Sequence, residues 1–225
     1  MQDLMDTNRL ETFSDGVFAV AITLLAVDLN ATGSGCSLAH RLVVQWPSYA
    51  AFVVSFATIG IMWLTHHQMF RMIRGVDHGL IVANLALLLV VTAYPFPTRV
   101  VAEAFQTGTA ADRRTAALFY GLWGVAIGLA VNVLWWWAVR GRRLIEMEAP
   151  QAILDARTRW SLLAPPAFVA ATLVAVVSPE ASVACDGALA LLPLLISDRV
   201  ARPLEPEVRA AVPADGGDRG PADLH

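Results

Sequence analysis

The sequence contains no lysine, and all 16 of its basic residues are arginines. Charged residues make up only 16% of the 225 residues, whereas they are about a quarter of an ordinary soluble domain. The formal net charge of -3 gives no electrostatic support to nucleic-acid binding, so we predict no nucleic-acid partner. The two cysteines, Cys36 and Cys185, form no CxxC pair, which argues against a zinc site or a redox motif.

Long apolar runs make up most of the chain. Hydrophobic residues account for 56% of it, and the charges cluster in short breaks between the runs. A helix needs about 20 mainly apolar residues to cross a bilayer. Six segments qualify, and the last is the weakest because it is short and contains Asp186, to which we assign no function. The predicted spans are residues 13–29, 42–65, 79–98, 115–139, 160–178 and 181–197.

The arginines fall unevenly on the two sides of these spans. With the N-terminus in the cytoplasm, 12 arginines lie in inside segments and 4 in outside segments. An even number of spans puts both termini on the same side of the membrane, and the positive-inside rule places that side in the cytoplasm. We therefore predict an all-α, multi-pass integral membrane protein with six transmembrane helices in residues 1–200. Residues 201–225 have no apolar face to bury and are predicted to form a disordered cytoplasmic tail.

The first span begins among polar side chains that a bilayer makes costly, namely Arg9, Ser14 and Asp15. Such groups usually lie inside a helix bundle and are paired there. A simpler alternative for Asp15 is a negative charge favoured by the positive end of the helix dipole. His66 and His67 close the second span, and they are either partners of these groups or an interfacial pair facing water.

The same span carries an apolar stripe with helical spacing, which also leaves two alternatives. A stripe in a membrane most often packs against lipid or another helix, and a pore lining is the rarer case. Asp28, near the end of the span, is either a solvated helix end or part of a carboxylate ring that concentrates cations. The stripe consists of Phe13, Val17, Val20, Leu24 and Val27.

One family shares these features. The string RLETFSDGVFAVAITLLAVDL resembles the opening helix of the bacterial transmembrane protein 175 family of potassium channels. That family is marked by Arg-x-x-x-Phe-Ser-Asp. The string WPSYAAFVVSFATIGIMWLTHHQMF resembles its second helix, and the third span, with Asp77, Asn84 and YPFPT, is also similar. The resemblance covers roughly residues 9 to 100, and the signature is matched by Arg9, Phe13, Ser14 and Asp15.

The resemblance implies a homotetramer in the bacterial inner membrane, with potassium ions crossing a central pore and no cofactor. In the family the first helix lines the pore in place of a TVGYG-type filter, which this sequence lacks. Apolar side chains matching Val20, Leu24 and Val27 form the constriction, and a hydroxyl matching Thr23 aids potassium selection. Val20 replaces a larger Leu or Ile of many relatives, which would widen the narrowest point.

The polar motif has a separate role in this interpretation. Arg9, Ser14 and Asp15 would bond to groups on the second and third spans and would position the first helix without touching the ion. The expected partners are His66, His67, Asp77 and Asn84.

Two other classes of protein remain as alternatives to a channel. A secondary transporter or proton-permeable carrier often has broken helices. The proline pairs 95/97 and 165/166 are weak signs of such breaks. A membrane enzyme needs a cluster of nucleophiles, acids or metal ligands, and His66-His67 without an HExxH motif is poor support for one. We therefore predict that the protein is not an enzyme.

Overall fold

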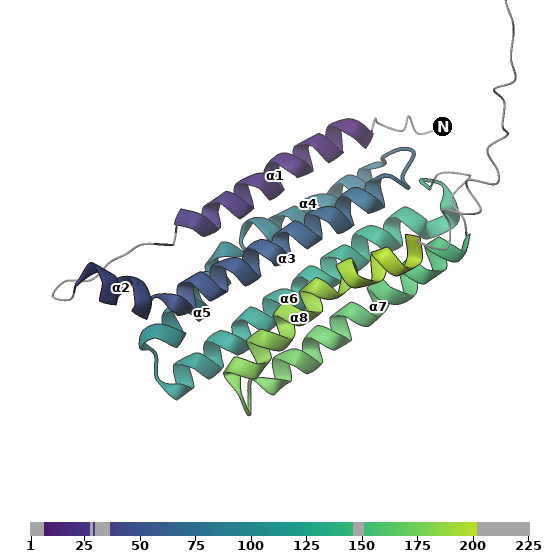
Figure 1. The fold of residues 1–225 in the computed structure, drawn as a ribbon. Helices are drawn as coiled ribbons and strands as arrows, with labels where there is room; N and C mark the ends of the chain where they lie inside the picture. The colour runs from purple at the N-terminus through teal and green to yellow at the C-terminus, as the bar shows by residue number, and fades with distance from the viewer. Residues whose placement is uncertain (1–6, 28, 30–36, 146–150, 202–225) are drawn as a thin grey trace, which may run out of the picture. The chain divides into compact units, whose positions relative to one another are not determined.

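The computed structural model describes residues 7–27, 29, 37–145 and 151–201, and most of these residues are helical (Figure 1). The predicted helical class is therefore confirmed. Residues 1–191 form one unit and residues 192–225 a second, in which the described residues are the end of the last helix. Asp28 and the predicted tail from residue 202 onward lie outside the described residues. The helices are α1 (Thr7–Val27), α2 (Leu38–Val44), α3 (Trp46–Phe70), α4 (His78–Thr92), α5 (Pro95–Thr107), α6 (Ala110–Val139), the short 3-10 helix η1 (Arg140–Arg142), α7 (Gln151–Val174) and α8 (Pro179–Ala201).

Four stretches of the described residues are long and apolar enough to cross a membrane. They overlap the first four predicted spans. The helices α7 and α8 overlap the fifth and sixth predicted spans and are 24 and 23 residues long, but they are not among the four. The six-span count therefore stays a prediction. The four stretches are Thr7–Val27, Trp46–Phe70, His78–Thr107 and Ala110–Arg142.

The third span is broken, although the sequence predicted it as one helix. Pro95 has no N–H to donate to the carbonyl of Val91, so α4 ends and the N–H of Tyr94 bonds to Val91 O at 3.0 Å instead. That tighter turn leaves the carbonyl of Val90 without its usual helical donor. The indole N–H of Trp123 on α6 donates to Val90 O at 3.0 Å, and this bond keeps the break compatible with an apolar environment.

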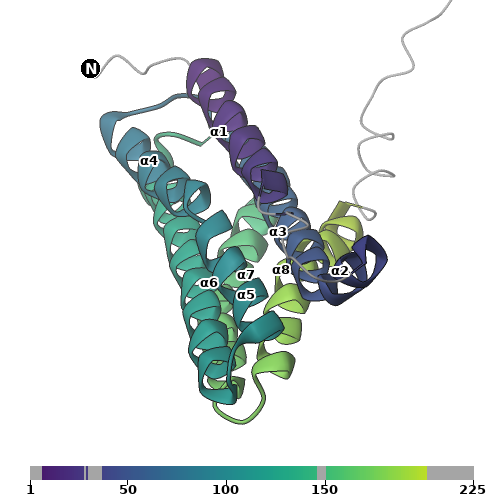
Figure 2. The ribbon, with the colours of Figure 1, turned by 90° about the vertical axis from the view of Figure 1, so that its left-hand side faces the viewer.

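Small residues on α6 allow it to pack closely against α7. The helix α6 packs extensively against both α7 and α4 (Figure 2). Glycines at 121, 124 and 128 lie on the face of α6 toward α7, and a Cβ at Gly121 would lie 2.3 Å from Thr172 Oγ1. A Cβ at Gly124 would lie 2.8 Å from Phe168 Cδ1. Small residues at such spacing let two membrane helices approach closely.

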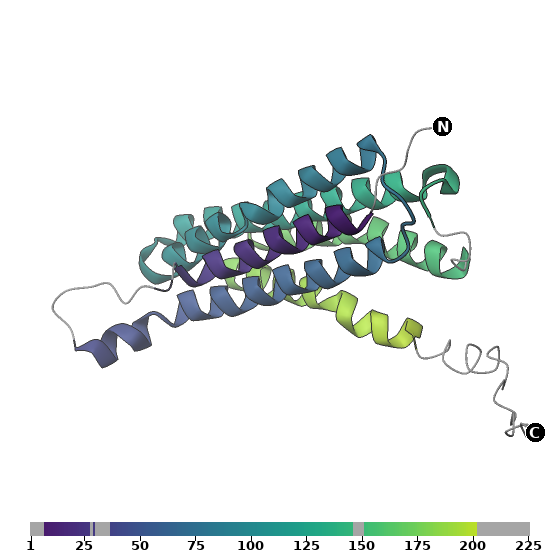
Figure 3. The same cartoon turned by 90° about the horizontal axis from the view of Figure 1, so that it is seen from above.

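The helix α1 lies against both α3 and α4, as the view from above shows (Figure 3). Phe18, Ala21 and Leu25 of α1 join the same buried core as residues of α3, α4 and α6. This placement brings the polar start of α1 next to the C-terminal end of α3 and the N-terminal half of α4.

Candidate functional site

The helix α1 has an inner and an outer face. On the inner face Ser14, Phe18, Ala21 and Leu25 follow the helical repeat and are all buried. The other face is open to the surroundings of the subunit. Thr23 lies on the exposed side, and its hydroxyl donates to the carbonyl of Val20 at 2.8 Å. The exposed apolar side chains are Phe13 (53% exposed), Val20 (54%), Leu24 (42%) and Val27 (65%).

Ser14 anchors the inner face through a buried hydrogen-bonded chain to two other helices. The Asn84 Nδ2 group of α4 donates to Ser14 Oγ at 2.9 Å, and Ser14 Oγ donates to the Leu10 carbonyl at 2.8 Å. The other end of the amide, Asn84 Oδ1, lies 2.8 Å from His66 Nε2 of α3. Because Oδ1 only accepts, His66 Nε2 must carry the proton. A single amide therefore joins α1, α3 and α4.

His66 is buried and packs against two aromatic rings. Its ring stacks on Phe70 with centroids 4.3 Å apart, and Phe18 of α1 lies at 5.4 Å. The ring is 1% exposed, so its orientation is fixed by packing as well as by the bond to Asn84. A polar group held in this way fixes the relative placement of the helices that it connects.

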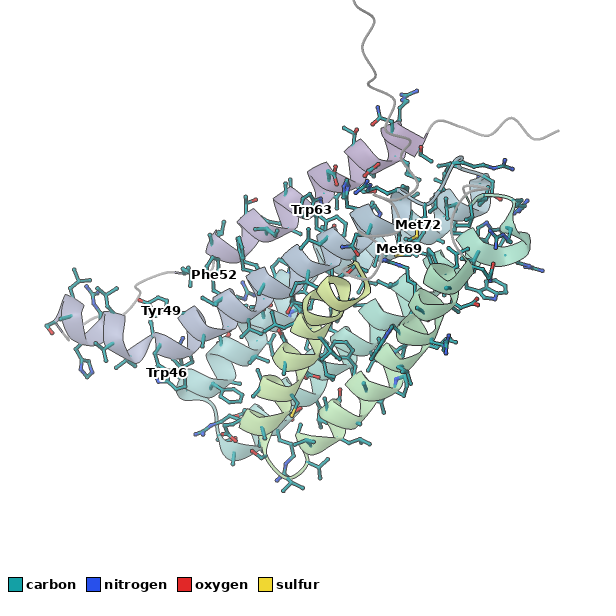
Figure 4. The ribbon with its side chains drawn as sticks, turned by 45° about the vertical axis from the view of Figure 1, so that its right-hand side comes forward. Trp46, Tyr49, Phe52, Trp63, Met69 and Met72 are labelled. Atoms are coloured by element: carbon teal, nitrogen blue, oxygen red, sulfur yellow. The ribbon has the colours of Figure 1, made fainter. Side chains whose placement is uncertain are left out.

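Two further contacts join α1 to α3 at positions one helical turn apart. Asp15 Oδ1 accepts from the indole N–H of Trp63 at 2.8 Å, and Glu11 Oε1 lies 2.7 Å from His67 Nδ1. Figure 4 shows Trp63 on α3 beside α1. Moving from residue 11 to 15 on α1 matches moving from 67 to 63 on α3, so the two helices run antiparallel in one fixed register.

Asp77 belongs to a different cluster from Ser14 and Asp15. It caps α4 by accepting from the backbone N–H of Leu80 at 2.8 Å, and it also accepts from Trp137 at 2.9 Å and from Arg143. Burial alone would raise the pKa of Asp77, but these bonds and the charge of Arg143 outweigh it and lower the pKa below 3.8. The cluster fastens the start of α4 to the end of α6.

The predicted polar network is thus only partly assembled within the described residues. Ser14, His66 and Asn84 come together, while Asp15 and His67 bond to Trp63 and Glu11, which the sequence analysis did not single out. Asp77 lies in its own cluster. Arg9 is exposed, and its side chain forms no hydrogen bond to any of the described residues.

The spacing of residues along α1 and α3 is the sequence signal that indicates Glu11 and Trp63 as partners. Glu11 and Asp15 are four residues apart, as are Trp63 and His67, so each pair lies on one face of its helix. Two such pairs on neighbouring antiparallel helices match in register. The expected partners included His66 and His67 but not Trp63, whose indole N–H donates to Asp15.

The site combines a fixed inner face with an exposed apolar outer face. Within the described residues the inner face satisfies its polar groups through α3 and α4, so α1 is held in one orientation. The outer face presents branched apolar side chains with a hydroxyl beside them. Such a face suits contact with lipid, with another subunit, or with a narrow passage shared by several subunits.

Comparisons with known proteins agree on one family. The sequence model described as "Endosomal/lysosomal potassium channel TMEM175" matches residues 9–95. A potassium channel of Streptomyces collinus is 45% identical over 193 residues, covering 83% of this chain and 90% of that protein. A potassium channel of Chamaesiphon minutus is 36% identical and covers 83% and 92%. The crystal structure of a lysosomal potassium-selective channel TMEM175 homolog from Chamaesiphon minutus has a TM-score of 0.76 at 35% identity, covering 85% of this chain and 97% of that one.

Proposed function

This chain belongs to the TMEM175 family, and from that membership we propose that it is a potassium-permeable ion channel of a bacterial cell membrane. The observation that carries the proposal is the outer face of α1. Val20, Leu24 and Val27 are exposed there in line with one another. Relatives named as potassium channels cover 83% of the chain, and the family model matches residues 9–95, which include this face of α1.

The assembly that we propose is a homotetramer in which four α1 helices surround one axis. Each subunit crosses the inner membrane six times, with α7 and α8 as the last two spans and both termini in the cytoplasm. The lengths of α7 and α8, 24 and 23 residues, are sufficient for spanning helices. The arginine distribution of 12 inside and 4 outside supports this orientation.

Val20, Leu24 and Val27 would form the constriction of this pore. A ring of apolar side chains at a narrow point excludes water, and an ion then loses solvation that the ring does not replace. A small widening readmits water and opens the path. Potassium gives up its water at lower cost than sodium, and the Thr23 hydroxyls would partly replace that water, so the same neck favours potassium.

The polar contacts of α1 would hold the constriction in place. Ser14, Asp15 and Glu11 tie one side of the helix to α3 and α4, which directs the opposite side toward the axis. This role concerns position, since none of these three side chains lies on the face that carries Val20 and Leu24.

Single-channel recording tests the proposal. The purified protein in planar bilayers should give discrete current steps in potassium gradients, whereas a carrier would give saturating flux without steps. Leu24→Asn should raise the current and reduce the preference for potassium over sodium, because a polar ring readmits water. Leu89→Asn is the matched control, since Leu89 is exposed on α4, and it should leave conductance unchanged. Unchanged currents in Leu24→Asn would contradict a pore lined by α1.

A further inference from the structure

A second buried polar cluster lies away from α1, between α3, α6 and the break that separates α4 from α5. Tyr94 OH lies 2.8 Å from Tyr120 OH, which lies 3.3 Å from Ser55 Oγ. Ser55 Oγ lies 2.8 Å from Thr98 Oγ1, and Thr98 Oγ1 lies 3.0 Å from the carbonyl oxygen of Tyr94. Each of the four side chains is at most 6% exposed, so the chain of bonds closes on Tyr94 inside the protein.

The carbonyl of Tyr94, at one end of this cluster, sets the direction of every hydrogen bond in it. The Tyr94 carbonyl can only accept, so Thr98 donates its single hydroxyl hydrogen there. Ser55 must then donate to Thr98, Tyr120 to Ser55, and Tyr94 OH to Tyr120. All four hydroxyl hydrogens are used within the ring. What the cluster offers to its surroundings is therefore lone pairs on oxygen and no donor.

Asp186 of α8 adds a carboxylate to these oxygens. It is 3% exposed, and both of its oxygens are buried with no hydrogen-bond partner among the described residues. Asp186 directly precedes Gly187 on α8, and Ser55 directly follows Val54 on α3. The helices α8 and α3 approach closely next to it, because a Cβ at Gly187 would lie 3.0 Å from Val54 Cγ1.

We propose that Asp186 and the hydroxyl oxygens of Tyr94, Tyr120 and Ser55 form a buried binding site for one alkali-metal cation within each subunit. Two sets of oxygen acceptors that lie near each other attract a cation, and carboxylate and hydroxyl oxygens are ligands of hard cations. One carboxylate balances one positive charge. A divalent ion would leave an excess charge in the interior, and the described residues contain no group of three or more Asp, Glu, His or Cys to balance it.

The site is separate from the proposed pore. Its residues come from α3, α6, α8 and the α4–α5 break, whereas the pore residues all lie on the outer face of α1. It does not require that the protein conduct ions. A cation here would join α8 to the core that α3 and α6 form, which would make the stability of the subunit depend on alkali ions.

Thermal unfolding in defined salts tests the site. The purified protein is held at constant ionic strength in N-methyl-glucamine chloride, and potassium or sodium chloride replaces it stepwise while tryptophan fluorescence reports unfolding. The unfolding temperature of the wild type should rise as the cation fills the site. The rise should be on the order of 3–6 °C when the cation concentration is ten times its dissociation constant. Asp186→Asn should abolish the rise. Thr23→Val, which alters the proposed pore only, should retain it and so separates this site from ions bound in the pore.

Tyr120→Phe keeps the carboxylate and removes one ligand oxygen. The rise in its unfolding midpoint should therefore saturate only at a several-fold higher concentration of potassium or sodium chloride. This variant tests the site even if Asp186→Asn does not fold. Three results would each overturn the proposal: a wild-type midpoint that ignores alkali ions, a midpoint that follows pH alone because a proton neutralises Asp186, or an Asp186→Asn protein that keeps the full cation-dependent rise.

Discussion

The carboxylate of Asp15 accepts a 2.8 Å hydrogen bond from the indole of Trp63, one turn of α1 away from the contact between Glu11 and His67. These two contacts fix both the direction and the register of α1 on α3. Together with the Asn84 amide, they hold the inner face of α1 against the subunit and leave its apolar outer face for other partners.

The buried hydroxyl of Ser14 should matter far more than a similar hydroxyl nearby. Ser14→Ala removes the acceptor of Asn84 Nδ2 in a buried site, which should cost about 1–3 kcal/mol of unfolding free energy. Thr12→Ala is the matched control, because Thr12 also donates to a carbonyl four residues back but is exposed. Its effect should stay within about 0.5 kcal/mol. Equal losses, measured by denaturant unfolding in detergent, would argue against the Asn84 anchor.

A double-mutant cycle should detect the pairing of Asp15 with Trp63. Asp15→Ala and Trp63→Phe should each destabilise the protein, and the double variant should lose less than the sum by at least about 0.5 kcal/mol. Thr12→Ala with Trp63→Phe serves as the reference pair, for which losses should add. Additive losses for Asp15 and Trp63 would show that the bond contributes nothing to stability.

Close packing of α6 on α7 predicts opposite effects at two helical glycines. A Cβ at Gly121 would meet Thr172 side-chain atoms at 2.3–2.9 Å, so Gly121→Ala should destabilise by about 1–3 kcal/mol. A Cβ at Gly60 of α3 would meet nothing within 4 Å. Gly60→Ala should therefore be neutral or stabilise by up to about 1 kcal/mol, because alanine restricts the unfolded chain. Thermal unfolding of the two variants checks the contrast.

The Asp77 cluster predicts acid sensitivity. Because the pKa of Asp77 is lowered in the folded protein, its stabilising contribution is fully present above pH 3.8 and is lost as the pH falls below 3.8 through the folded value. Unfolding midpoints measured from pH 6 down to pH 3 should fall more steeply for the wild type than for Asp77→Asn. Parallel curves would mean that the Asp77 charge does not stabilise the fold.

Much of the fold could be predicted because a bilayer imposes a simple rule of length and apolarity. That rule located the four stretches that the structure also supports as possible spans. It failed within the third, where Pro95 ends α4 while the apolar run continues. Composition alone does not report that the carbonyl freed by this break is satisfied by Trp123, 33 residues later.

The polar site was harder to predict than the spans, because partners on different helices depend on register. The bond between Ser14 and Asn84 follows the expectation that polar groups of the first span are paired. The partners Glu11 and Trp63 became evident only once α1 and α3 were placed side by side. Asp186, to which the sequence assigned no function, is buried in the structure, and both of its carboxylate oxygens lack a hydrogen-bond partner among the described residues.

The bond from Trp123 to Val90 also bears on the order of assembly. The segment that holds α4 and α5 cannot complete its own backbone bonding at the proline, so on its own in a bilayer it would expose a bare carbonyl to hydrocarbon. Docking of α6 supplies the missing donor. We therefore expect stable insertion of the segment to depend on docking of α6, and Trp123→Phe should keep the bulk of the side chain but leave the Val90 carbonyl without this donor.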